Sequence, residues 1–551
     1  MADNSELSDN AEQTASSARV ARAAATGSIA VFTSRITGLA REIILTRKFG
    51  ASMDYEAYLL GFRIPNLTRD LFAEGALSSA FVPVFVEYLS TKDKQEAARL
   101  ANLVATGIIF IVGAICLLGI AGSPFLVEAF GGGFHQVPGK FEQAVVMTRI
   151  MSPFLLLVAL AAQAMGILNA LNIYALPALS STLFNVGSVA TGLFLGFVAN
   201  DYLGISHIEG VAWGVVAGGA MQLLIQVPSL IRNGFVFKFA FDMSHPGLQR
   251  ILKTMLPAIL GNAAVQINVL VNSNFASHLI DPERGANGAV SWLNCSFRFM
   301  QLPLGVFGVA IASATLPAIS RAAGFGDMNE FRRTLSRSMG LVLLLTVPSS
   351  VGLALLGTSI VGAIYEGGKF NQYDTMQTAY ALSCFSIGLS AYACLKVLTP
   401  AFYALKDSRT PMIVSLASIA VNYLMASQMT RIAGHAGLAI STSAVALTGA
   451  IAQYFILERR LGTIGGSPLL ATLLKVLAGS LVMAVTIWCL SAAIGMQTGA
   501  GKLNYWSNIL VTIPLGTVAY YFTCKWLGVA ELETASNALT GPMTRLRAKI
   551  R

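Results

Sequence analysis

This sequence has few charged residues. Asp, Glu, Lys and Arg make up only 12% of its 551 residues, whereas a soluble domain carries about 25%. Hydrophobic residues account for 55% and the mean hydropathy is +0.65. This composition excludes an ordinary soluble protein and indicates a chain that crosses a membrane many times.

Cysteine and histidine are also scarce, and neither forms a recognisable ligand pattern. The six cysteines lie in or beside apolar runs without C-x-x-C spacing, and the five histidines are dispersed. The chain has no HExxH, GxSxG or P-loop motif. We therefore expect no enzyme activity, and the sequence leaves any metal ligands unknown.

The sequence also has no connection between apolar runs that is long enough to form a soluble domain. The net charge of +10 is not gathered on a soluble domain, so we expect no nucleic-acid partner. Residues 1–25 are polar and lack an apolar core, which excludes a cleavable signal peptide. We expect a disordered cytoplasmic tail there.

What the chain has instead is apolar runs of the length that crosses a bilayer, which is about 20 residues. We predict an all-α polytopic membrane protein with about fourteen transmembrane helices. Lys and Arg concentrate in the connections that would share a side with both chain ends, which predicts cytoplasmic termini. The expected spans lie near 27–47, 66–90, 101–129, 146–171, 176–200, 209–231, 250–279, 287–318, 337–365, 374–404, 411–431, 437–457, 468–496 and 505–527.

An internal repeat appears at an offset of six spans. "FAEGALSSAFVP" (72–83) in the second span resembles "FGVAIASATLP" (307–317) in the eighth, and a proline followed by an asparagine recurs in the fifth and eleventh. Parallel repeats of this kind are typical of secondary transporters, with the site between two lobes. The predicted division is a tail at 1–25, an N-terminal lobe at 26–235, a C-terminal lobe at 236–460, two further helices at 461–530 and a cytoplasmic tail at 531–551.

The first span carries charges that a bilayer helix should not contain. In "SRITGLAREIILTRKFG" (34–50), Arg35, Arg41 and Glu42 share an arc roughly 140° wide. A lipid-facing Arg at mid-span costs at least about 3 kcal/mol, so these charges must face a wet cavity or pair within the bundle. Arg69, Glu74 and Arg298 lie in other spans. Guanidinium groups bind phosphate oxygens through two N–H groups, so such a cavity predicts a polyanionic head group.

Several blocks resemble one known family. "SRITGLAREIILTRKFGAS" and "FRIPNLTRDLFAEGALSSAFVPVFVEYL", with "PLGVFGVAIASATLPAIS", "YEGGKF" and "KVLTPAFYALKDSRTP" further along, are similar to the MurJ (MviN) family of bacterial lipid II flippases. That family belongs to the multidrug/oligosaccharidyl-lipid/polysaccharide exporter superfamily and has fourteen helices in two lobes plus two extra helices. The resemblance implies substrate-binding arginines at Arg35, Arg41, Arg69 and Arg298. It implies supporting acids at Glu42, Glu56 and Glu74.

The resemblance also implies a function in peptidoglycan biosynthesis. Lipid II, an undecaprenyl pyrophosphate carrying a disaccharide-pentapeptide, would move from the cytoplasmic to the periplasmic leaflet of the inner membrane by alternating access. Its lipid tail would follow a groove of the last two helices. No cofactor is implied, and coupling would use the membrane potential, with sodium or protons as candidate ions. Some family members bind sodium in the C-terminal lobe. The implied partners are membrane lipids and the cell-wall synthesis machinery, and the expected state is a monomer.

Two residues depart from the family pattern. Asp70 stands where a second basic residue is common, and Phe297 stands where an acid is common.

Two alternative functions remain open. A flippase for another undecaprenyl-linked glycan, such as an O-antigen or capsule unit, would share the cationic cleft. A drug/cation antiporter would need acidic cavity residues, whereas this chain has an excess of arginine.

Overall fold

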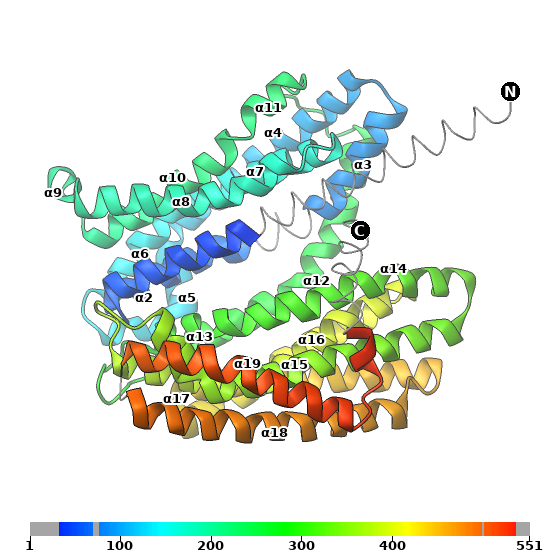
Figure 1. Cartoon of the computed structure of the whole chain (residues 1–551). Helices are drawn as coiled ribbons and strands as arrows, with labels where there is room; N and C mark the ends of the chain where they lie inside the picture. The colour runs from blue at the N-terminus through cyan, green and yellow to red at the C-terminus, as the bar shows by residue number, and fades with distance from the viewer. Residues whose placement is uncertain (1–31, 70–76, 499–500, 536–551) are drawn as a thin grey trace, which may run out of the picture. The chain divides into compact units, whose positions relative to one another are not determined.

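Helices dominate the part of the chain that the computed structural model describes, which is residues 32–69, 77–498 and 501–535 (Figure 1). Two isolated β-bridges, Asp281–Gly285 and Gly367–Phe370, are the other regular pairings in these ranges. Nine helices of the described part are long and apolar enough to cross a membrane. The predicted all-α, polytopic membrane fold is therefore confirmed, while the count of fourteen spans stays a prediction.

The helices occupy the expected positions, and each predicted span overlaps one. After a first helix at 32–49 come α2 (Met53–Arg69), α3 (Ser78–Thr91), α4 (Lys94–Ala121), α5 (Ser123–Gly131), α6 (Lys140–Met151), α7 (Pro153–Ala170), α8 (Ala175–Phe197), α9 (Asn200–Leu203), α10 (His207–Leu224), α11 (Val227–Arg232) and α12 (Pro246–Ser277). They are followed by α13 (Ala289–Pro303), the π-helical turn η3 (Leu304–Val309), α14 (Ala310–Phe325), α15 (Met328–Ile364), α16 (Gln372–Ala404), α17 (Arg409–Leu461), α18 (Gly466–Thr498) and α19 (Lys502–Trp526).

Two of the differences from the predicted spans have identifiable reasons. The second span was expected from residue 66, but α2 already begins at Met53. The prediction missed the first part of this helix because Asp54, Glu56 and Arg63 interrupt its apolar run. Spans expected at 411–431 and 437–457 form the single element α17. Non-helical backbone at Ala433 and Gly434 kinks it between them. Glycine suits that kink because Gly434 has φ +54°, which a side chain disfavours.

Two compact units make up the chain. The first consists of the residues up to Thr46 together with Ser52–Gln266, and the second of Arg47–Ala51 together with Ile267 onward. The boundary thus falls inside α12, and the lobe limits inferred from the sequence stay a prediction. The expected tail at 1–25 and residues 536–551 of the expected C-terminal tail lie outside the described residues.

The segment Arg47–Ala51 packs within the second unit although the chain on both sides belongs to the first. The Arg47 side chain donates to the Ile364 carbonyl at 2.7 Å, and the Lys369 amide donates to the Arg47 carbonyl at 2.9 Å. A Cβ at Gly368 would lie 2.1 Å from that same Arg47 oxygen, so only glycine permits this approach. The "YEGGKF" block therefore has a structural role in receiving this turn.

Small residues let α8 and α10 approach closely. Gly210, Gly214 and Gly218 recur every four residues along α10, the spacing that brings membrane helices into contact. A Cβ at Gly214 would lie 2.4 Å from the Ser188 carbonyl oxygen of α8, and one at Gly210 would lie 2.3 Å from the Gly196 nitrogen. The two backbones therefore touch along this stripe.

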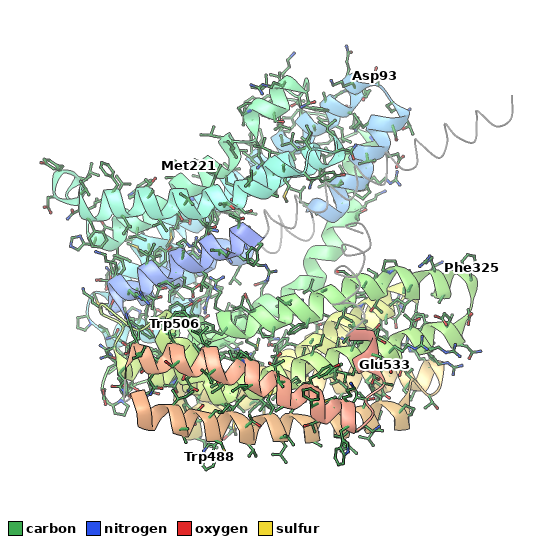
Figure 2. All side chains as sticks on the ribbon, viewed as in Figure 1. Asp93, Met221, Phe325, Trp488, Trp506 and Glu533 are labelled. Atoms are coloured by element: carbon green, nitrogen blue, oxygen red, sulfur yellow. The ribbon has the colours of Figure 1, made fainter. Side chains whose placement is uncertain are left out.

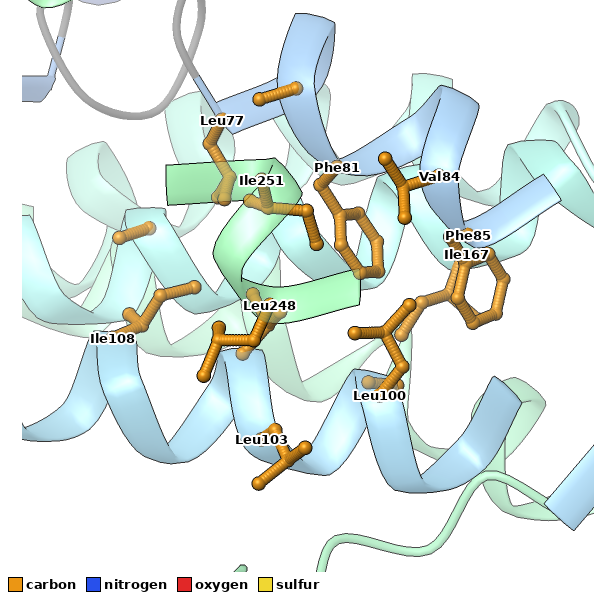
Figure 3. Packing of buried hydrophobic residues seen from close by; sticks show 14 of the residues in the cluster. Leu77, Phe81, Val84, Phe85, Leu100, Leu103, Ile108, Ile167, Leu248 and Ile251 are labelled. Atoms are coloured by element: carbon orange, nitrogen blue, oxygen red, sulfur yellow. The ribbon is translucent and has the colours of Figure 1, made fainter. Parts of the chain in front are cut away.

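The buried apolar residues of the first unit gather between α3, α4, α7 and the start of α12. Figure 3 shows Phe81 and Phe85 of α3 packed with Leu100 of α4 and with Leu248 and Ile251 of α12. Other large apolar side chains point outward from the helices. Trp488 of α18 is 69% exposed and Phe325 at the end of α14 is 88% exposed (Figure 2). Outward apolar side chains on so many helices suit a surface covered by lipid.

The turn between α16 and α17 is fixed by Asp407. Its carboxylate accepts from the Thr410 hydroxyl and from the backbone amides of Arg409 and Thr410, and it pairs with Arg460. The hydrogen bonds from Thr410, followed by the Arg460 contact, lower the pKa of Asp407 from 3.8 to about 2. The charged carboxylate therefore holds the first turn of α17.

Asp407→Asn should loosen that turn. At neutral pH we expect hydrogen exchange at the Arg409 and Thr410 amides to speed up on the order of threefold to tenfold, since the cap loses its charge. Because the folded pKa lies below the ordinary one, the wild type should keep its protection above pH 3.8 and approach the variant as pH falls toward about 2. Hydrogen-exchange mass spectrometry, corrected for the intrinsic pH dependence, measures this. Asp201→Asn on α9 is the control, and equal exchange in wild type and Asp407→Asn at pH 7 would contradict the capping role.

Candidate functional site

The first helix packs against α8 through a stripe that includes one of the predicted arginines. Ser34, Thr37, Gly38 and Arg41 follow the helical spacing of i, i+3, i+4 and i+7. Asn185 Nδ2 of α8 donates to the Ser34 carbonyl at 3.1 Å and lies 3.3 Å from Thr37 Oγ1. A Cβ at Gly38 would lie 3.4 Å from the same Nδ2 atom. This stripe therefore brings Arg41 to α8.

Arg41 lies between two aromatic rings from different helices. Its Cζ is 5.4 Å from the centroid of the Phe62 ring on α2 and 5.1 Å from that of the Phe184 ring on α8. The Phe154 ring of α7 lies 5.8 Å from Phe62 and 5.2 Å from Phe184. Each cation–π contact contributes about 0.5–2 kcal/mol, more as water is excluded. The half-buried guanidinium also lines a small pocket with Tyr58.

The three charges that the helical wheel placed on one arc have different surroundings. Arg35 is exposed, Arg41 is half-buried, and Glu42 is only 4% exposed. A wheel gives the angle of a side chain but not the neighbouring helix that covers it. The structure therefore separates Arg35, which is open to the surroundings, from Arg41, which is held among aromatic rings.

Glu56 forms a buried ion pair that the sequence did not reveal. Its Oε2 lies 2.6 Å from Lys140 Nζ of α6, and the two side chains are 2% and 1% exposed. Lys140 Nζ also lies 4.2 Å from the centroid of the Phe134 ring. Lys140 lies between two predicted spans, where the sequence carries no signal of burial. Glu56 therefore joins α2 to α6.

The remaining predicted residues are spread over both units. Arg69 is half-buried at the last position of α2, and Glu74 lies outside the described residues. Arg298 is exposed on α13 of the second unit, shortly before Pro303 and the η3 turn. The unusual Phe297 beside it packs against Phe385, with ring centroids 5.4 Å apart.

The second unit contains a cluster of uncharged polar side chains between α12 and α17. Asn268 Nδ2 donates to Ser418 at 3.0 Å, and Asn272 Nδ2 donates to Thr442 at 3.1 Å. Asn422 Nδ2 donates to the Asn268 carbonyl at 3.3 Å. This last bond parallels that from Asn185 to the Ser34 carbonyl in the first unit, six spans earlier, which supports the internal repeat.

The uncharged side-chain oxygens of this cluster are of the kind that bind sodium ions. The Oδ1 atoms of Asn268 and Asn272 are buried and have no hydrogen-bond partner among the described residues. Amide and hydroxyl oxygens are ligands that hard cations accept, so these residues fit a sodium ion in donor type. The cluster itself contributes no negative charge. Within the described ranges, no group of three or more His, Cys, Asp or Glu side chains could hold a metal.

Comparison with known proteins gives one family. A family model described as "Lipid II flippase MurJ" matches residues 45–505. A relative from Burkholderia cenocepacia, described as "Lipid II flippase MurJ", is 33% identical over 462 residues, covering 83% of this chain and 87% of its own. A "Probable lipid II flippase MurJ" from Bdellovibrio bacteriovorus is 34% identical over 505 residues, with 91% and 93% covered.

Solved structures agree with the sequence relatives. One described as "Lipid II flippase MurJ, inward closed conformation" has a TM-score of 0.73 and 26% identity, covering 94% of this chain and 99% of its own. An inward-facing multidrug resistance transporter of the MATE family, in the MOP superfamily, has a TM-score of 0.59 at 15% identity and shares the fold. Since the family model spans most of the chain and curated relatives exceed 30% identity over most of their length, the chain belongs to the MurJ family.

Proposed function

We propose that this protein flips lipid II from the cytoplasmic to the periplasmic leaflet of the bacterial inner membrane. The observation that carries the proposal is the family match over residues 45–505, in which the relatives are named lipid II flippases. Moving a lipid-linked head group across the bilayer requires no bond to be made or broken, so the protein is proposed to act as a transporter. Both termini are proposed to be cytoplasmic and the protein monomeric, acting beside the cell-wall synthesis machinery.

The proposed binding residues are Arg35, Arg41, Arg69 and Arg298. A pyrophosphate presents oxygens that a guanidinium binds through two parallel N–H groups, and Arg stays charged at any physiological pH. Glu42, which is buried on the same helix, is proposed to balance the charge of Arg41. Glu56 supports the site indirectly, because its pair with Lys140 holds α2, which carries Phe62 and Arg69.

We propose that the two units rock to alternate access, as in other transporters with parallel repeats. The apolar tail stays in lipid, because each buried CH₂ is worth about 0.8 kcal/mol, and we place it along α18 and α19. An inside-negative potential returns an empty cationic site inward with about 2.3 kcal/mol per charge per 100 mV. A bound sodium ion would supply positive charge at Asn268 and Asn272. Protons remain the other candidate coupling ion.

The test measures lipid II at the outer face of cells depleted of their own flippase. We expect the intact protein to restore outward lipid II and Arg298→Ala, at matched membrane level, to lose at least about 90% of that activity, since a lost charged hydrogen bond reduces binding tenfold or more. Arg321→Ala, an exposed arginine on α14, is the control and should behave as wild type.

The other outcomes are also informative. If neither protein restores outward lipid II although both are folded in the membrane, another undecaprenyl-linked glycan becomes the better substrate. If both restore it, lipid II is the substrate and the assignment of Arg298 is wrong.

A further inference from the structure

Arg41 differs from Arg35 and Arg298 in what surrounds it. It is half-buried beside two ring faces, Phe62 at 5.4 Å and Phe184 at 5.1 Å, whereas Arg35 and Arg298 are exposed. The two rings come from α2 and α8, which lie far apart in the sequence. Phe154 touches both of them and is fully buried, so the rings themselves are held in place.

Ring contacts of this kind restrain an arginine without consuming its hydrogen-bond donors. A ring attracts the guanidinium through its face, whereas a phosphate oxygen binds through the N–H groups at the edge. A free arginine loses much side-chain freedom when it binds a ligand, and an arginine that is already restrained loses less. The two rings therefore favour an Arg41 that is ordered before the anion arrives.

The backbone beside Arg41 is restrained by the same neighbour. Asn185 follows Phe184 on α8 and donates to the Ser34 carbonyl, two turns before Arg41 on the first helix. Gly38 between them allows α8 to come close, since a Cβ there would lie 3.4 Å from Asn185 Nδ2. Adjacent residues of α8 thus fix both the helix that carries Arg41 and its guanidinium.

We propose that Phe62 and Phe184 are positioning residues that hold the Arg41 guanidinium ready for a pyrophosphate-type anion. The inference rests on the proposed function, and in particular on Arg41 as a binding residue. The competing explanation is that the two rings only fill space. The two explanations differ in one respect: positioning acts through Arg41 and needs a ring, whereas filling space needs only volume.

The experiment measures lipid II binding to the full-length protein in lipid nanodiscs, together with thermal stability. We expect Phe184→Leu to weaken binding on the order of tenfold, because leucine keeps apolar volume but has no ring face. Phe184→Tyr should restore binding to within about twofold, since tyrosine keeps the ring. Phe194→Leu is the matched control on the same helix, where the side chain is 56% exposed, and it should leave binding unchanged.

A double-mutant cycle with Arg41→Ala separates the outcomes. If the rings act through Arg41, Phe184→Leu should weaken binding no further in the Arg41→Ala background. If it weakens binding equally in both backgrounds, or behaves as Phe194→Leu in the wild type, the positioning role is refuted while Arg41 keeps its function. If Arg41→Ala binds lipid II as tightly as wild type, the assignment of Arg41 fails first. Should Phe184→Leu not fold, Phe62→Leu and Phe62→Tyr provide the same comparison from α2.

Discussion

Lys140→Met should destabilise the protein by about 3–5 kcal/mol, because it leaves the Glu56 carboxylate buried without its cation. Both side chains are almost fully buried, and the Nζ–Oε2 distance is 2.6 Å. A charge enclosed in this way cannot be hydrated, so removing one partner costs more than the pair itself contributes. Thermal unfolding of the purified protein in detergent, followed by intrinsic fluorescence, measures the loss.

The double variant distinguishes this explanation from simple loss of packing. Lys140→Met combined with Glu56→Leu removes both charges, and we expect it to recover most of the lost stability, since apolar pairs often replace buried ion pairs without cost. Lys92→Met, at an exposed lysine after α3, serves as the control for removing a positive charge. A double variant as unstable as Lys140→Met would contradict the role assigned to the unpaired carboxylate.

Gly214→Leu should separate α8 from α10 and destabilise the first unit by at least about 3 kcal/mol, the upper range for overpacking a close contact. A Cβ at Gly214 would lie 2.4 Å from the Ser188 oxygen and 2.6 Å from Gly192 Cα. Both neighbours are backbone atoms, so no side chain can rotate away to make room.

Folded yield in the membrane and thermal stability report this effect. Gly113→Leu on α4 is the matched control, because a Cβ there has no neighbour within 4 Å among the described residues. Leucine also favours helix more than glycine does, so the control should be neutral or slightly stabilising. An unchanged melting temperature for Gly214→Leu would mean that the two helices can move apart freely.

The elements of this fold follow from hydropathy, because membrane helices must satisfy their backbone hydrogen bonds internally and present apolar side chains to lipid. The apolar runs near 101–129 and 374–404 therefore correctly predicted α4 and α16. Hydropathy did not predict the start of α2 at Met53, because this part of the helix carries Asp54, Glu56 and Arg63 and is not an apolar run. Apolar length identifies helices that face lipid better than it identifies those that carry buried charge.

The site was only partly predictable for a related reason. The cost of an intramembrane arginine drew attention to Arg41, and that argument needs one helix alone. Its neighbours Phe62 and Phe184, and the pairing of Glu56 with Lys140, depend on how separate helices pack. A phenylalanine in a hydrophobic sequence carries no signal that it faces a cation. Family resemblance supplied residue roles, but it did not supply these contacts.

The turn at Arg47–Ala51 determines what two fragments of this protein would contain if the chain were cut between the units. Because those five residues cluster with the second unit, the chain passes between the units three times, at 46/47, 51/52 and 266/267. After a single proteolytic cut behind Gln266, the N-terminal fragment would therefore still contribute Arg47–Ala51 to the second unit. Of two coexpressed halves divided at that point, the N-terminal one would carry the whole first unit together with Arg47–Ala51, and the C-terminal one would lack those five residues of its own unit. Although the sequence repeats itself, its C-terminal half is therefore not a self-contained module.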